Sequence, residues 1–174
     1  MPGSLTTLSS HHKNQLEIFL TEFDVDPSEL HGYFCPRSWP IERVVKSLDG
    51  WGRGVGLDDG WVPCTTHFWI KDDVIQGVIN IRHSLTPSLE EIGGHIGYCV
   101  APTQRRQGVA TSMLAAALPL CQRLGITRAL LTCDAENVAS AKTIERCGGT
   151  LDREAWSERA QKTQRWYWID LSSL

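Results

Sequence analysis

Apolar residues at helical spacing open the chain. Over residues 16–23 they recur three and four positions apart, which predicts an amphipathic helix that ends at the Asp-Val-Asp-Pro run of residues 24–27. The same spacing over residues 41–48 predicts a short second helix, with Pro40 in its first turn. Residues 1–12 are mostly small and polar and are expected to be disordered.

Two runs rich in β-branched and aromatic residues follow, at residues 66–70 and 74–82, and they predict a β-hairpin. After a loop at residues 84–90, a third strand is expected over residues 94–100. Residues 50–63 form a long glycine-rich loop without the terminal lysine of a P-loop. Because loops of this length often line a binding site, we expect it to form a wall beside the substrate.

An apolar stripe over residues 108–124 predicts a long helix, in which Pro119 should produce a kink or a local break. The continuous apolar run at residues 127–133 is typical of a buried strand, consistent with parallel pairing across this helix. The remaining expected elements are a short helix and two closing strands: residues 137–147, 150–155 and 164–171. The order of elements predicts an α/β (α+β) fold, in which helices flank a central mixed β-sheet.

Composition narrows the class of protein. With 174 residues, 41% of them hydrophobic, the chain fits one domain spanning residues 1–174. A net charge of -3 gives no reason to expect nucleic acid or an anionic membrane as a partner, and neither a transmembrane run nor a signal peptide is present. We therefore expect a cytoplasmic protein. Its six cysteines contain no C-x-x-C pair, which favours buried reduced thiols and no metal site.

The stretch between the third strand and the long helix has the composition of a phosphate-binding site. A helix N-terminus carries unpaired backbone N–H groups and a partial positive charge. Gly108 and Ala110 leave that backbone accessible, and Arg105 and Arg106 add fixed charge beside it. The alternative interpretation of the two arginines is a solvated surface pair.

These residues also carry a resemblance to a known family. Residues 105–110 fit the Arg/Gln-x-x-Gly-x-Gly/Ala signature of the GNAT superfamily of N-acetyltransferases, with Val100 and Pro102 in its usual lead-in. Residues 137–140 followed by 147–149 resemble its second conserved segment. Residues 68–171 as a whole are similar to a branch of uncharacterised predicted bacterial acetyltransferases, whose particular marks here are residues 82–83, 94–98 and 165–168.

The resemblance implies a GNAT-like acyl-CoA N-acyltransferase fold. It also implies transfer of an acetyl group from acetyl-CoA, as co-substrate, to a primary amine of a small molecule or peptide by direct attack. The pyrophosphate would lie beside Arg105 and Arg106. It would rest on the N–H groups of the following five residues, which are Gln107, Gly108, Val109, Ala110 and Thr111.

For the pantetheine arm, the resemblance implies a slot between the splayed fourth and fifth strands. The arm would pair with the backbone near Cys99 and Val100, and a backbone N–H close to Val100 would polarise the thioester carbonyl. The side chain of Asn137 would meet the arm, with Ser140 nearby. Asn137 is also a natural helix N-cap, and the two roles are compatible. Ser140 has the alternative of an ordinary first-turn residue.

The general acid that many family members use is missing. Seven residues after the helix-starting asparagine the family often has a tyrosine, and this chain has Ile144. Ser140 and Tyr98 are the candidate replacements.

For the general base, Glu91 and His95 are the candidates. They lie four residues apart, so an unbroken strand would direct both to one face, although a bulge at residues 93–94 would undo this parity. His83 is a weaker third choice. In the competing interpretation, His95 is a structural hydrogen-bonding residue and Glu91 a loop charge. A base is unnecessary if the amine arrives neutral.

Two other function classes stay open at this point. The missing tyrosine motivates a non-catalytic acyl-CoA-binding or sensing module, whereas a generic nucleotide-binding domain lacks a supporting P-loop or Rossmann pattern. We expect acceptor specificity in residues 28–66 and 156–163. The oligomeric state stays open, and the aromatic last strand is the element that could pair in a homodimer.

Overall fold

The computed structural model describes residues 3–172, which form two antiparallel β-sheets and the helices around them. The first sheet has the strand order β1-β2-β3-β4 and the second has the order β5-β7-β6. The strands of the first sheet are β1 (Ser4–Thr6), β2 (Cys64–Lys71), β3 (Val74–Arg82) and β4 (Ile96–Val100). Those of the second are β5 (Arg128–Asp134), β6 (Thr150–Ser157) and β7 (Lys162–Asp170).

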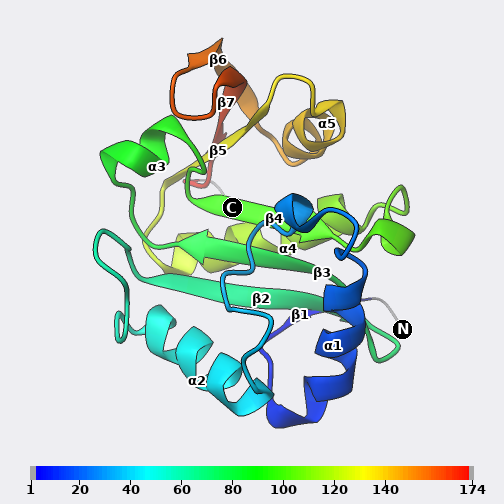
Figure 1. Cartoon of the computed structure of the whole chain (residues 1–174). Coiled ribbons are helices and arrows are strands. Elements are labelled where there is room, and N and C mark those ends of the chain that lie inside the picture. The colour runs from blue at the N-terminus through cyan, green and yellow to red at the C-terminus, as the bar shows by residue number, and fades with distance from the viewer. Residues whose placement is uncertain (1–2, 173–174) are drawn as a thin grey trace.

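Helices cover both faces of the first sheet (Figure 1). On one face lie α1 (Lys13–Thr21) and α2 (Ile41–Gly52), and on the other lies α4 (Val109–Arg123). Helix α5 (Val138–Arg146) contacts α4 and β5. The short helical turns are η1 (Ser10–His12), η2 (Pro27–Glu29), α3 (Pro87–Glu91) and η3 (Pro102–Gln104).

Side-chain alternation along β3 divides the interior into two apolar clusters. Ile79 and Ile81 pack toward α4, whereas Val78 packs toward α1 and α2 with Phe68 of β2. All four side chains have an exposed fraction of 0%. Because successive residues of a strand point to opposite faces, one strand supplies both clusters. The expected α+β fold with flanking helices is confirmed, but the strands form two antiparallel sheets in place of one central mixed sheet.

Strands β4 and β5 meet at one point and otherwise belong to separate sheets. The His95 amide donates to the Leu130 carbonyl at 2.7 Å, and the Leu130 amide donates to His95 Nδ1 at 2.9 Å. A β-carbon at Gly94 would lie 2.2 Å from the Leu130 oxygen, so this approach requires glycine. The expectation of parallel pairing for the buried strand is therefore wrong, because β5 forms its ladder with β7, antiparallel.

Three local expectations also differ from the structure. Residues 4–12 are ordered, because β1 pairs with the outer edge of β2 and Leu8 is buried; residues 1–2 lie outside the described part of the chain. The expected loop at residues 84–90 contains α3, which Thr86 caps. Helix α4 is continuous through Pro119, without the local break considered for that position.

The last strand lies inside its sheet. β7 pairs with β5 on one side and with β6 on the other, so its two edges are already used. A homodimer formed by pairing at an edge of this strand would therefore lack a free edge. In the second sheet, β5 and β6 are the outer strands.

Candidate functional site

A cavity of about 830 Å³ follows the gap between β4 and β5. It is lined by β4, by the start of α4, by the start of α5 and by the segment of residues 29–34 that precedes α2. Most of the site residues expected from the sequence line it: Tyr98, Cys99, Val100, Arg105, Arg106, Gly108, Val109, Ala110, Thr111, Asn137 and Ser140. Gln107 does not, because it is exposed and its side-chain amide donates to the Thr103 carbonyl.

The start of α4 offers unpaired backbone donors to the cavity. Gly108 is the N-cap, with a left-handed φ of 79°. The first intrahelical bond runs from the Ser112 amide to the Gly108 carbonyl at 3.0 Å, so the three amides of residues 109–111 have no partner within the helix. Arg106 also adopts a left-handed φ, of 64°. Such a turn with free amides at a helix N-terminus is suited to an anion.

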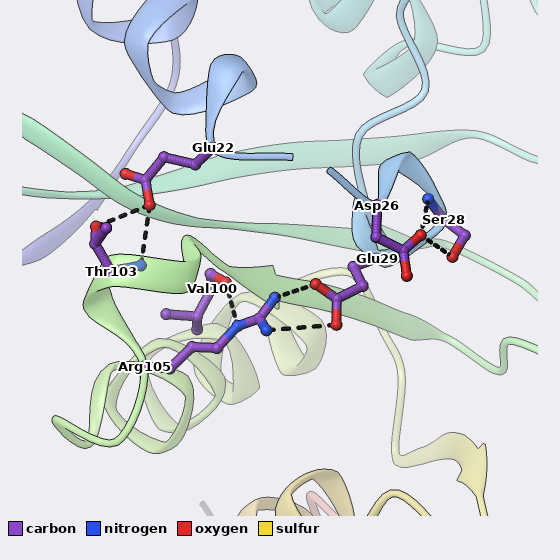
Figure 2. A network of polar contacts seen from close by, with 7 residues as sticks. All are labelled: Glu22, Asp26, Ser28, Glu29, Val100, Thr103 and Arg105. Atoms are coloured by element: carbon purple, nitrogen blue, oxygen red, sulfur yellow. Dashed lines mark hydrogen bonds and ion pairs between the residues drawn. The ribbon is translucent and has the colours of Figure 1, made fainter. Parts of the chain in front are cut away.

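Arg105 is held in a polar network rather than lying free in solvent (Figure 2). Its Nε donates to the Val100 carbonyl at 3.2 Å, and its Nη2 forms an ion pair with Glu29 at 2.7 Å. Beside it, Glu22 accepts from the amide and the hydroxyl of Thr103 at 3.0 and 2.8 Å. The network joins the end of α1 and η2 to the loop ahead of α4, so it fixes these segments against each other.

The backbone of β4 presents alternate residues to the gap. The Arg82 amide donates to the His95 carbonyl, and the Ala101 amide donates to the Gln76 carbonyl, so the strand residues 97, 99 and 101 direct their backbone groups toward β3. His95, just ahead of the strand, turns only its carbonyl that way, because its amide donates to Leu130. Tyr98 and Val100 therefore direct theirs toward β5. Of the two strand residues expected to pair with pantetheine, Val100 has the required backbone direction and Cys99 does not.

Tyr98 and Ser140 meet inside the cavity. Their hydroxyl oxygens lie 3.0 Å apart, although 42 residues separate them along the chain. Burial raises the pKa of Tyr98 to about 12, so its hydroxyl is protonated near neutral pH. Asn137 caps α5 by accepting from the Ser140 amide at 3.0 Å, which leaves its own side-chain N–H groups for another partner. Ile144 has an exposed fraction of 0% and packs in the α4 cluster.

The candidate bases do not line the cavity. Glu91 ends α3, where it accepts from the Ser157 hydroxyl at 3.1 Å. His95 is buried against Leu130, and burial lowers the pKa of its imidazole. His83 contacts the Thr65 hydroxyl at 2.7 Å. The shared face expected for Glu91 and His95 is absent because the chain turns at residues 93–94, both of which have positive φ.

Several lining residues were not identified from the sequence. Lys142 and Arg146 lie four residues apart on α5, and this spacing, which places both on one helical face, is the signal that could have found them. Glu29, His31 and Asp134 also line the cavity, but no local pattern marks them.

The segment that lines the cavity is not the glycine-rich loop predicted to form a wall beside the substrate. No residue of the predicted loop at residues 50–63 lines the cavity, and the segment of residues 29–34 takes that place. Trp61 of the predicted loop contacts this segment, with the centre of its ring 5.4 Å from that of Phe34. Trp51, expected in the same loop, belongs to α2 and is buried.

Neither a membrane-spanning helix nor a metal-binding cluster is found in the part of the chain that the structure describes. Its helices are too short or too polar to cross a bilayer. Within residues 3–172, no three His, Cys, Asp or Glu side chains gather in a way that could hold a metal ion.

Comparison with known structures finds proteins of the same fold that are described as acetyltransferases. RimL, a ribosomal L7/L12 α-N-protein acetyltransferase in complex with coenzyme A, is 16% identical, with a TM-score of 0.70 over 100% of this chain and 97% of that one. RimJ of Mycobacterium smegmatis, in complex with CoA-disulfide, is 17% identical, with a TM-score of 0.70 over 98% and 82%. The microcin C7 self-immunity acetyltransferase MccE, in complex with acetyl-CoA and AMP, is 16% identical, with a TM-score of 0.66 over 97% and 92%.

At these identities the structures establish the fold alone, and among curated proteins no sequence matches this chain. The family follows from a sequence model described as "Acetyltransferase (GNAT) domain", which matches residues 7–150. That match covers most of the chain and includes the first turn of α4 and the start of α5. The protein therefore belongs to the GNAT family of acetyltransferases.

Proposed function

We propose that this protein transfers an acetyl group from acetyl-CoA to a primary amine of a small molecule or peptide by direct attack. The observation that carries the proposal is the cavity between β4 and β5, which has unpaired amides of α4 at one end and the hydroxyl groups of Tyr98 and Ser140 along its wall. The described relatives of the same fold bind CoA or acetyl-CoA, which supports the choice of co-substrate.

Donor binding uses the start of α4 and the edge of β4. The amides of residues 109–111 receive the pyrophosphate, and Lys142 and Arg146 supply positive charge from α5. The backbone of Val100 and the side-chain amide of Asn137 hold the pantetheine arm. Arg105 contributes by fixing the Val100 carbonyl and Glu29.

In the chemical step a C–N bond forms and the C–S bond of the thioester breaks. Tyr98 donates its hydroxyl proton to the departing sulfur, and Ser140 stabilises the phenolate by hydrogen bonding. A phenolate with a raised pKa is a strong base, so it recovers a proton from the new amide nitrogen. Since the expected bases are outside the cavity, the amine enters in its neutral form.

Steady-state assays with a panel of amines test the proposal. Release of free CoA and an acetylated product, detected by mass spectrometry, are expected, and kcat/KM should rise with pH along the titration of the acceptor amine. Acetyl-CoA should raise Tm, while ATP and NAD should not. Acetyl-CoA binding without turnover across the panel would favour a non-catalytic acyl-CoA-binding module, and stabilisation by ATP or NAD alone would contradict the donor assignment.

A further inference from the structure

A positively charged side chain lies at the end of the cavity remote from the start of α4. Arg82 ends β3, and its amide bonds to His95, immediately before β4 begins. The five residues of β4 separate this point from the phosphate-side loop, which corresponds to roughly 16 Å of strand. Arg82 lines the cavity there, together with Gly97 and Phe34. It is therefore too remote from the α4 amides to share their phosphate ligand.

Only part of the hydrogen-bonding capacity of the Arg82 guanidinium is used within the protein. Nη1 donates to the carbonyls of Gly93 and Gly94 at 3.0 and 3.1 Å, and Cζ lies 5.7 Å from the centre of the Phe34 ring. Within residues 3–172, neither Nε nor Nη2 has a hydrogen-bond acceptor, and no Asp or Glu forms an ion pair with Arg82. A guanidinium has five N–H donors, so several stay available for a ligand.

One of the unused donors, Nη2, lies along the cavity wall. A β-carbon built at Gly97 would lie 3.4 Å from Nη2, so this nitrogen runs directly beside a residue that lines the cavity next to Tyr98. Desolvation lowers the pKa of Arg82, yet an arginine keeps its charge at neutral pH. A desolvated cation without a counter-ion is unfavourable, and a carboxylate is the group whose planar geometry matches the two-pronged guanidinium.

We infer that Arg82 binds a carboxylate of the acceptor, so that the preferred substrates are amines with a carboxylate close to the reacting nitrogen. This inference rests on the proposed function, because it assigns the acceptor end of the same cavity. Free α-amino acids and peptides with an acidic side chain near the N-terminus share this chemistry. Nη1 keeps its bonds to Gly93 and Gly94, while Nη2 and Nε receive the carboxylate.

Matched pairs of acceptors provide the test. Each amino acid of a panel is compared with its amide, and peptides that begin with Asp or Glu are compared with their Asn or Gln counterparts. The wild-type protein should favour the carboxylate member by about 10- to 100-fold in kcat/KM, as expected for a charge-assisted pair. The arm that shows the preference, amino acid or peptide, identifies the source of the carboxylate.

Variants of Arg82 separate recognition from structure. Arg82→Gln should remove the preference, mainly through KM for the carboxylate member, while Arg82→Lys keeps the charge and should retain part of it. Neither should change the Kd of acetyl-CoA. Arg53→Gln is a matched control, because Arg53 is exposed and pairs only with Asp49 on α2. Circular dichroism and Tm report whether each variant folds.

Different failures have different meanings. Turnover of neutral amines with no carboxylate preference in the wild type would overturn this inference and leave the proposed function intact. Equal losses for both members of each pair in Arg82→Gln and Arg82→Lys would assign Arg82 a structural role at residues 93–94. No turnover with any acceptor, despite acetyl-CoA binding, would overturn both.

Discussion

The contact between Tyr98 and Ser140 gives the sharpest test of the chemical step. Tyr98→Phe removes the hydroxyl that we assign as proton donor and leaves the ring in place on β4. Ser140→Ala removes its partner but preserves the first turn of α5, because the capping bond of Asn137 uses the backbone amide of Ser140. The two variants therefore alter the chemistry without removing an element of the fold.

The structure sets the expected magnitudes. A neutral hydrogen bond of 3.0 Å contributes about 1 kcal/mol to stability, so each variant should unfold at a slightly lower Tm. Loss of a general acid lowers a rate by about 10²- to 10⁴-fold. Because the pKa of Tyr98 is raised to about 12, its proton is retained throughout the usual assay range, and this group should produce no fall in rate below about pH 11.

A double-mutant cycle on kcat distinguishes a coupled pair from independent groups. If Ser140 acts through Tyr98, the double variant should lose no more activity than Tyr98→Phe alone. Single-turnover measurements with saturating acetyl-CoA isolate the chemical step from binding. Retention of kcat within about twofold in both single variants, with the fold intact, would refute the assignment of either hydroxyl as the acid.

Two further predictions concern the start of α4 and the contact between the sheets. Gly108→Ala and Gly125→Ala should each cost about 1–2 kcal/mol, because both residues have left-handed φ and open space around the missing β-carbon, but only Gly108→Ala should raise KM for acetyl-CoA. Equal effects on KM would argue against a phosphate-binding role for the start of α4. His95→Gln should destabilise the protein by about 1–3 kcal/mol near pH 8, measured by urea unfolding, because the buried Leu130 amide loses its acceptor. Because burial lowers the pKa of His95, the unfolded state binds more protons than the folded state below about pH 6.5. The free energy of unfolding of the wild type should therefore fall as pH decreases through that range. The fall should be less steep in His95→Gln. Burial also lowers the pKa values of His67 and His83, so the dependence of stability on pH should be weaker in His95→Gln but should not vanish. An unchanged slope would contradict the role of His95.

Most of the secondary structure could be predicted from local pattern. The hairpin of β2 and β3, the long helix α4 and the N-cap at Asn137 all follow from residues that are neighbours in the sequence. β1 could not be predicted, because three residues with little pattern of their own become a strand only against the edge of β2. The short helix α3 was missed because its five residues carry no apolar periodicity.

The candidate site also combines local features, which could be predicted from the sequence, with contacts between distant residues, which could not. The free amides of α4 depend on a helix start and a left-handed glycine, both of which are local properties. The pairing of Arg105 with Glu29 joins residues 76 positions apart, and it could not be read from the signature that contains Arg105. Glu91 and His95 do not share a face, because the backbone turns at residues 93–94, both of which have positive φ. This is the alternative that the sequence left open, and only the structure decided between it and an unbroken strand.

The sequence by itself determined the GNAT signature, most of the order of elements and the prediction of an anion site at the start of α4, because these depend on residues close together in the chain. Only the tertiary structure decided which side chains share the cavity. Tyr98 meets Ser140 because β4 and β5 diverge beyond His95, while Ile144 is directed into the core. Contacts between distant residues depend on how sheets and helices pack, and no local pattern encodes that geometry.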